Sequence, residues 1–229
     1  MAFLAELNGL GLHATDIGNA CPESDTSERA AVIVGPEFGE LQDHVLIVQN
    51  ALCSLHSSGK MWHEKFADCM RHLGFFPSKA EPDVWMRRNG DICEHVAVCV
   101  DDLVFAVKNP EELLKALSND PFNFKLKGSG LITFHLGMDF TRDENGVLVM
   151  APRKHIKKLL ANCERLLGRS PKVTGASLIL KGDHPELDTS DLLGPEQVKI
   201  CQSLVGALQW AVSIGRFDVM TAVVTLSAF

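Results

Sequence analysis

Two adjacent carboxylates divide a segment that otherwise has the composition of β-strand. The segment reads VAVCVDDLVFAV from Val96 to Val107, and β-branched and aromatic residues of this kind favour strands. It contains no glycine or proline that could form a turn. We therefore expect a hairpin with Asp101 and Asp102 at its tip.

Two explanations of this acidic pair are open. Asp is a common turn residue, and for the pair alone a solvated structural turn is the more frequent explanation. The other explanation is a cation, because adjacent carboxylates on a rigid hairpin can hold Mg²⁺ against the phosphates of a substrate. The rest of the chain has to decide between them.

The pattern of apolar residues predicts an α+β chain. Strands are expected at 12–17, 31–34, 45–48, 84–86, 92–100, 103–107, 131–140 and 147–150, where short apolar runs end in turn residues. Helices are expected at 1–7, 61–73, 110–117, 156–167, 197–214 and 217–229, where apolar residues recur at helical spacing or lie between helix boundary signals. Residues 168–195 are rich in Gly, Pro, Asp and Ser and predict a long loop.

Charge is distributed unevenly along the chain. The net charge of −7 argues against a free-standing nucleic-acid-binding protein. Residues 1–50 nevertheless hold eight acidic residues and one basic residue, whereas residues 151–172 hold seven basic residues and one acidic residue. The basic segment is either a phosphate-contacting element or a solvated helix face.

Composition also indicates the cellular compartment and whether the chain can form a globular core. A hydrophobic content of 46% is enough for a sizeable core. The seven cysteines have no C-x-x-C spacing, which favours free thiols in a reducing compartment. No basic leader or membrane-length apolar run is present, so we expect an intracellular protein, cytoplasmic or nuclear, that is neither secreted nor membrane-bound.

A metal site for phosphoryl transfer needs carboxylates from a second segment of the chain. Asp16 has the right position, since it lies at the end of the predicted strand 12–17 and before Gly18. Taken alone, a strand-terminal Asp is more often a helix cap or a turn residue.

Together these residues resemble the reverse transcriptases of copia-type retrotransposons. The segments that carry the resemblance, in the family's order along nearly the whole chain, are TDIGNA at 15–20, ALCSL at 51–55 with WHEK at 62–65, CVDD at 99–102, FHLGM at 134–138, and SLVG at 203–206 near RFD at 216–218. Each motif is weak by itself, but the ordered set favours the metal explanation of the acidic pair.

The resemblance implies a right-hand polymerase fold: a palm with an antiparallel sheet and flanking helices, followed by a helical thumb and connection. Residues 1–11 would end the fingers, 12–150 would form the palm and 151–229 the thumb and connection helices. Two Mg²⁺ ions, replaceable by Mn²⁺, would be held by Asp16 and Asp101 with Asp102 in support. Lys127 would protonate the leaving group, although a solvated lysine before a glycine turn is an equal alternative.

The resemblance also assigns contacts with nucleotide and nucleic acid. Cys21, Cys53 and Ser54 would line the nucleotide pocket. The primer and template would meet the hairpin of His135, Leu136 and Gly137 and the basic helix, whose residues are Arg153, Lys154, Lys157 and Lys158. The expected partners are an RNA/DNA template–primer duplex, a dNTP and the rest of a Pol polyprotein with its integrase and ribonuclease H.

Several positions depart from the family pattern. Cys99, Cys53, Cys201 and His155 stand where the family usually has tyrosine, Cys21 replaces an aromatic residue, and the chain has no tyrosine at all. Two functions therefore stay open: an RNA-directed DNA polymerase fragment, or a noncatalytic remnant with the same fold and weak nucleic-acid binding. A metal-dependent phosphatase or an unrelated α+β binding module is a third and weaker alternative.

Overall fold

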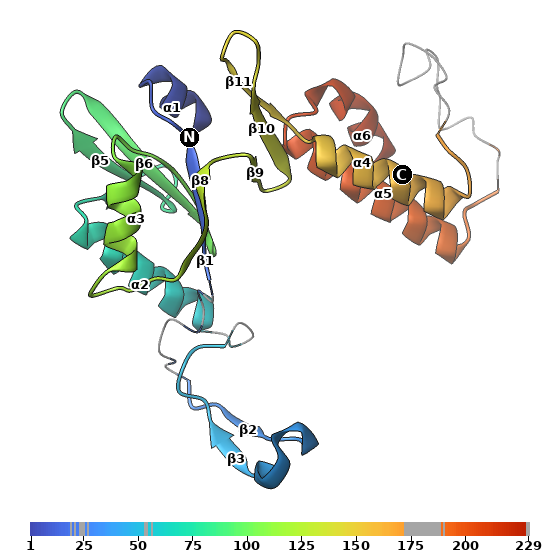
Figure 1. The fold of residues 1–229 in the computed structure, drawn as a ribbon. Helices are drawn as coiled ribbons and strands as arrows, with labels where there is room; N and C mark the ends of the chain where they lie inside the picture. The colour runs from blue at the N-terminus through green and yellow to red at the C-terminus, as the bar shows by residue number, and fades with distance from the viewer. Residues whose placement is uncertain are drawn as a thin grey trace. The chain divides into compact units, whose positions relative to one another are not determined.

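The chain forms two compact units, Met1–Ile132 and Thr133–Phe229. The computed structural model describes residues 1–229 except 19, 21, 23–25, 27, 53, 54, 56, 172–188, 190 and 228–229. Each unit has its own sheet and its own helices (Figure 1).

The first unit is built on a six-stranded sheet with the order β4-β5-β6-β7-β1-β8. The strands are β1 His13–Ile17, β4 Phe76–Pro77, β5 Val84–Asn89, β6 Ile92–Cys99, β7 Asp102–Ala106 and β8 Leu126–Leu131. Every neighbouring pair is antiparallel. This order inserts the N-terminal strand β1 between two strands that come far later in the sequence.

Two helices, α2 (Ser58–His72) and α3 (Pro110–Ser118), cover one face of this sheet. Their apolar residues recur at helical spacing and pack on alternate residues of the strands, such as Ile17, Leu103 and Phe105. A short helix, α1 (Ala2–Leu7), precedes β1. The core is aromatic at its centre, where the ring centroids of Trp62 and Phe66 lie 6.0 Å apart.

A separate hairpin lies between β1 and α2 in the sequence. It consists of β2 (Ala31–Ile33) and β3 (Val45–Ile47), with the 3₁₀ helix η2 (Pro36–Leu41) in its loop. All residues of both strands are exposed, including Ile33 and Ile47.

The second unit combines a three-stranded sheet with helices. Its strands, in the order β11-β10-β9, are β9 Phe134–His135, β10 Met138–Arg142 and β11 Leu148–Ala151. Its helices are α4 Arg153–Leu167, α5 Pro195–Ser213, η4 Phe217–Val219 and α6 Met220–Leu226. His155 of α4 is hydrogen-bonded through Nε2 to the carbonyl oxygen of Ala207 on α5, at 3.0 Å.

Most of the predicted elements are confirmed. The structure contains the acidic hairpin, and the strands predicted at 31–34 and 45–48 and at 84–86 and 92–100 pair as two further hairpins. It also contains the helices predicted at 61–73, 110–117 and 156–167, with shifted ends. The predicted strand at 131–140 is wrong, because Leu136 and Gly137 both have positive φ and turn the chain into the β9–β10 hairpin. A two-residue turn with positive φ at both positions suits the twist of a hairpin.

Five cysteines lie among the described residues. Cys69, Cys93, Cys99, Cys163 and Cys201 are free thiols, and burial raises the pKa of Cys69 to about 12. No helix in the described part of the chain is both long enough and apolar enough to cross a membrane.

A buried carboxylate connects several segments of the first unit by hydrogen bonds. Glu94 on β6 is almost fully buried and accepts hydrogen bonds from Arg87 Nη2 at 2.7 Å, from Asn89 Nδ2 at 3.0 Å and from the backbone N–H of Lys108 at 2.9 Å. Arg87 also donates to the carbonyl oxygen of Leu73, just after α2. Burial alone would raise the pKa of Glu94, but these hydrogen bonds and the Arg87 charge outweigh it and lower that pKa.

We expect Glu94→Gln to lower the free energy of unfolding at neutral pH by about 2–4 kcal/mol, because Arg87 and the Lys108 N–H lose an ionised partner. A carboxyl with a lowered pKa in the folded state stabilises above its unfolded pKa of about 4.3, and this contribution disappears as the pH falls. The difference between variant and unaltered chain in urea unfolding should therefore shrink below about pH 4. Asp68→Asn, which removes an exposed pair with Arg71, is the control and should cost less than about 1 kcal/mol. Equal losses from both variants would contradict this role of Glu94.

Candidate functional site

The acidic hairpin and the Asp16 strand are neighbours in the sheet. In the antiparallel pairing of β1 with β7, Asp16 lies directly opposite Asp102. The next residue along β1, Ile17, donates its backbone N–H to the carbonyl oxygen of Asp101 at 2.8 Å. The structure thus brings the three aspartates of the sequence motifs to neighbouring backbone positions, although Asp16 and Asp101 are 85 positions apart in the chain.

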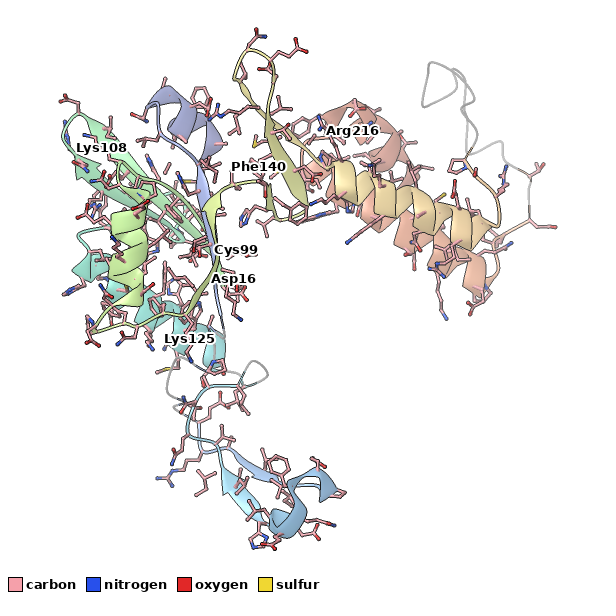
Figure 2. The ribbon with its side chains drawn as sticks, viewed as in Figure 1. Asp16, Cys99, Lys108, Lys125, Phe140 and Arg216 are labelled. Carbon is pink, nitrogen blue, oxygen red and sulfur yellow. The ribbon has the colours of Figure 1, made fainter. Side chains whose placement is uncertain are left out.

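Asp16 and Asp102 point away from the helices. Ile17 and Leu103 belong to the core under α2 and α3, and successive residues of a strand point to opposite faces. The two carboxylates therefore occupy the other face, together with Cys99, which lies opposite Asp102 in the β6–β7 pairing. Figure 2 labels Asp16 and Cys99 close together, at the end of the sheet away from Lys108.

The turn that carries Asp101 has an unusual backbone. Cys99 and Asp102 pair directly, so Val100 and Asp101 form a two-residue loop. Val100 has a φ of 58°, and Asp101 is not among the residues with positive φ. This pattern corresponds to a type II′ turn, in which glycine is the usual residue at the first position. A β-branched residue in that region is strained.

Lys127 lies on the other side of Asp16. It is directly opposite Asp16 in the pairing of β1 with β8, and the register of this pair shifts between Ala14 and Asp16. Ala14 pairs with Gly130, so β8 has one residue more than β1 over this stretch. Without this bulge, Lys127 would pair with Ile17 and point toward the core. The extra residue therefore turns Lys127 to the face of the carboxylates.

Local hydrogen bonds hold the bulge. The hydroxyl of Thr15, which is buried, donates to the carbonyl oxygen of Lys127 at 3.2 Å and lies 2.7 Å from the hydroxyl of Ser129. Gly128 has a φ of 63°, as expected for the glycine of such a bulge. In the sequence, this bulge is visible only as the Gly-Ser-Gly triplet at 128–130.

The Lys127 side chain extends along the backbone that follows Asp16. A Cβ atom at Gly18 would lie 2.7 Å from Cε and 3.0 Å from Nζ of Lys127. The absence of a side chain at Gly18 therefore leaves room for the ammonium group of Lys127. One lysine and three aspartates thus lie at the same end of this sheet.

The chemistry of these groups suits a hard divalent cation. Carboxylate oxygens are the ligands that Mg²⁺ prefers, and two carboxylates directly opposite each other repel unless a positive charge lies between them. Among the described residues, however, no three His, Cys, Asp or Glu side chains are already grouped as metal ligands. Opposed Cβ atoms of a sheet are only about 5 Å apart, so rotation of the short Asp side chains is enough to bring Asp16 and Asp102 to a common ion.

The predicted primer-contacting residues belong to the second unit. His135 ends β9, and Leu136 and Gly137 form the turn to β10. A Cβ atom at Gly137 would lie 3.3 Å from the indole Nε1 of Trp210 on α5. The three residues therefore lie on a hairpin, as the sequence motif predicted, and its turn packs against a helix of the same unit.

The predicted basic residues lie on α4 and are exposed: Arg153, Lys154, Lys157 and Lys158. Asp139 on β10 accepts a hydrogen bond from the backbone N–H of Lys154 at 3.0 Å, and the Lys154 ammonium lies 3.6 Å from the same carboxylate. The ammonium also lies 4.5 Å from the centroid of the Phe134 ring. The start of the basic helix is therefore fixed to β9 and β10.

The predicted nucleotide-pocket residues Cys21, Cys53 and Ser54 lie outside the described residues.

Fold and site together define an α+β domain with a cluster of carboxylates on two neighbouring antiparallel strands. The family described as reverse transcriptase (RNA-dependent DNA polymerase) matches residues 1–174. The chain therefore belongs to the reverse transcriptase family, a class of nucleotidyltransferases.

Two relatives agree with this assignment. A transposon Ty5-1 protein of Saccharomyces cerevisiae is 24% identical over 187 residues, which cover 82% of this chain and 59% of the relative. The retrovirus-related Pol polyprotein from transposon RE1 of Arabidopsis thaliana is 23% identical over 219 residues, 93% of this chain and 14% of the relative. The chain thus spans about three fifths of the first relative and a small part of the second. No solved structure matches it significantly.

The bulge predicts different effects for two glycines of β8. Gly128→Ala should lower the free energy of unfolding by about 1–2 kcal/mol, because alanine is strained at a φ of 63°. Gly130→Ala is the matched control, because a Cβ atom has no neighbour within 4 Å at either position and Gly130 has no positive φ. This control should change the free energy of unfolding by less than about 0.5 kcal/mol. Urea unfolding measures both, and equal effects would contradict the bulge.

Proposed function

We propose that the carboxylates of this chain form the active site of an RNA-directed DNA polymerase from a copia-type retrotransposon, which adds a dNTP to a primer 3′-hydroxyl. The observation that carries the proposal is the pairing of Asp16 with Asp102, with Asp101 held to the same strand through Ile17. Family membership supports the reaction class.

In this proposal each charged side chain has one task. Asp16 and Asp101 hold two Mg²⁺ ions, for which Mn²⁺ is a substitute, and Asp102 supports the site from the position opposite Asp16. Bound there, the ions would lower the pKa of the primer 3′-hydroxyl and neutralise charge on the triphosphate and the leaving pyrophosphate. The carboxylates thereby orient the reacting groups, and their own mutual repulsion is relieved.

Lys127 is the proton donor to the leaving group in the same proposal. Its position opposite Asp16 and its path along Gly18 support this role. An ammonium beside the carboxylates also stabilises negative charge that develops on a leaving phosphate. Lys127 is exposed, so the solvated-lysine alternative stays open, and its position opposite Asp16 is what supports the role of proton donor.

The second unit would bind the template–primer duplex. We assign the hairpin of His135, Leu136 and Gly137 to the primer, and the exposed basic residues of α4 to phosphates. Phosphate contacts of this kind position a duplex without reading its sequence. In this proposal residues 1–11 end the fingers, residues 12–150 make up the palm, and residues 151–229 are the thumb and connection helices. A Pol polyprotein supplies the other activities.

A noncatalytic remnant is the second candidate function. The observation that favours it is Cys99, whose side chain position faces Asp102 where the family usually has the ring of tyrosine. The loss of that ring leaves the carboxylates but alters the surface beside them. Such a protein would keep the fold and bind nucleic acid weakly through α4.

Primer extension on an RNA template in Mg²⁺ separates the two functions. The unaltered chain should incorporate dNTPs, and Asp101→Asn should reduce incorporation at least about 100-fold, because one charged ligand is lost. Asp91→Asn is the matched control, since Asp91 lies in the exposed turn of the β5–β6 hairpin, and it should leave the rate unchanged.

Equal incorporation by the unaltered chain and Asp101→Asn would contradict the catalytic assignment. Absence of incorporation by either protein, with retained binding of the duplex, would favour the noncatalytic function.

A further inference from the structure

A hydrogen bond joins helix α2 to the turn that carries the acidic pair. The indole Nε1 of Trp62 donates to the carbonyl oxygen of Val100 at 2.6 Å. Trp62 is only 3% exposed, so its indole is largely buried. The helical spacing expected at 61–73 includes Trp62, but it does not reveal this polar contact.

The turn needs such a restraint. Val100 has a φ of 58°, which is unfavourable for a β-branched residue, and its side chain is 64% exposed and so contributes little packing. A strained backbone persists only where the surrounding contacts hold it in place. The side chain of Val100 itself therefore does not explain why the turn keeps this conformation.

Two bonds hold successive carbonyl groups of this turn. The Val100 carbonyl is bound by Trp62 from α2, and the Asp101 carbonyl is bound by the Ile17 N–H from β1. A cavity of about 180 Å³, lined in part by Trp62 and Val100, lies beside the first bond. Close packing is thus incomplete on that side, and the direction of the Val100 carbonyl depends on the indole N–H.

We propose that Trp62 is a positioning residue, whose indole N–H holds the Val100–Asp101 turn so that Asp101 and Asp102 face the end of β1 at Asp16. The proposal rests on the proposed function only for the use of these carboxylates as metal ligands. The geometry of the turn is a separate and independently measurable property.

Trp85 provides a matched control. It is also buried, at 1% exposure, and both indoles pack against Phe66, with ring centroids 6.0 Å away for Trp62 and 6.5 Å away for Trp85. Within the described part of the chain, however, the buried Nε1 of Trp85 has no hydrogen-bond partner. Trp62→Phe and Trp85→Phe therefore remove similar volume, but only the first removes a hydrogen bond to the turn.

Two measurements on the full chain test the proposal. Hydrogen exchange followed by NMR reports on the Ile17 amide, which is bonded to Asp101, and electron paramagnetic resonance reports on the affinity for Mn²⁺. In Trp62→Phe the Ile17 amide should exchange at least about 10-fold faster and Mn²⁺ should bind about 10-fold more weakly, which corresponds to loss of one hydrogen bond. Trp85→Phe should change neither value by more than about 2-fold.

A second variant separates the turn from general loss of stability. Glycine accepts a φ of 58° without strain, so Val100→Gly in the Trp62→Phe background should return Ile17 exchange to within about 2-fold of the unaltered chain. If Trp62 acted only by filling the core, Val100→Gly would not restore the exchange rate of the Ile17 amide.

The outcomes distinguish the two proposals. Equal Ile17 exchange in Trp62→Phe and Trp85→Phe, or no rescue by Val100→Gly, would overturn the positioning role. If the unaltered chain binds no Mn²⁺, the proposed function fails, while the exchange of the Ile17 amide still decides whether Trp62 holds the turn.

Discussion

The antiparallel register between β1 and β7 is the constraint on which the rest of the site depends. It sets Asp16 opposite Asp102 and directs the Ile17 N–H to the Asp101 carbonyl. Because side chains alternate along a strand, a slip of one residue would send Asp16 into the core under α2 and bring Ile17 to the carboxylates. The apolar residues Ile17 and Leu103 therefore fix the position of the charged ones, since their burial allows only one register.

A bulge and two hydrogen bonds act in addition to this register and adjust the backbone locally. The bulge at Gly128 turns Lys127 toward Asp16, the Thr15 hydroxyl holds that bulge, and the Trp62 indole holds the Val100 carbonyl. Each of these contacts holds the backbone in a conformation that differs from a regular strand, in which side chains simply alternate between the two faces. A site with opposed like charges requires such fixed backbone, because electrostatic repulsion between Asp16 and Asp102 would otherwise push the strand ends apart.

The sequence predicts the acidic hairpin and most elements because these depend on local pattern. Apolar runs around Asp101 and Asp102 define β6 and β7, and helical spacing defines α2 and α3. The proximity of Asp16 to Asp102 is implied only by the resemblance, because no local rule relates residues 86 positions apart. The bulge, the φ of Val100 and the break of the predicted strand at Leu136 depend on tertiary contacts and backbone twist, which hydrophobic pattern does not encode.

We propose that strand register, rather than acidic composition, creates a cation site at the end of β1. Substoichiometric Mn²⁺ in an NMR titration tests it directly, because a bound paramagnetic ion broadens the amide signals nearest to it. We expect the signals of Asp16, Asp101 and Asp102 to disappear first, while those of the acidic pair Glu111 and Glu112 at the start of α3 persist. Earlier loss at Glu111 and Glu112, or uniform broadening of all acidic segments, would contradict it.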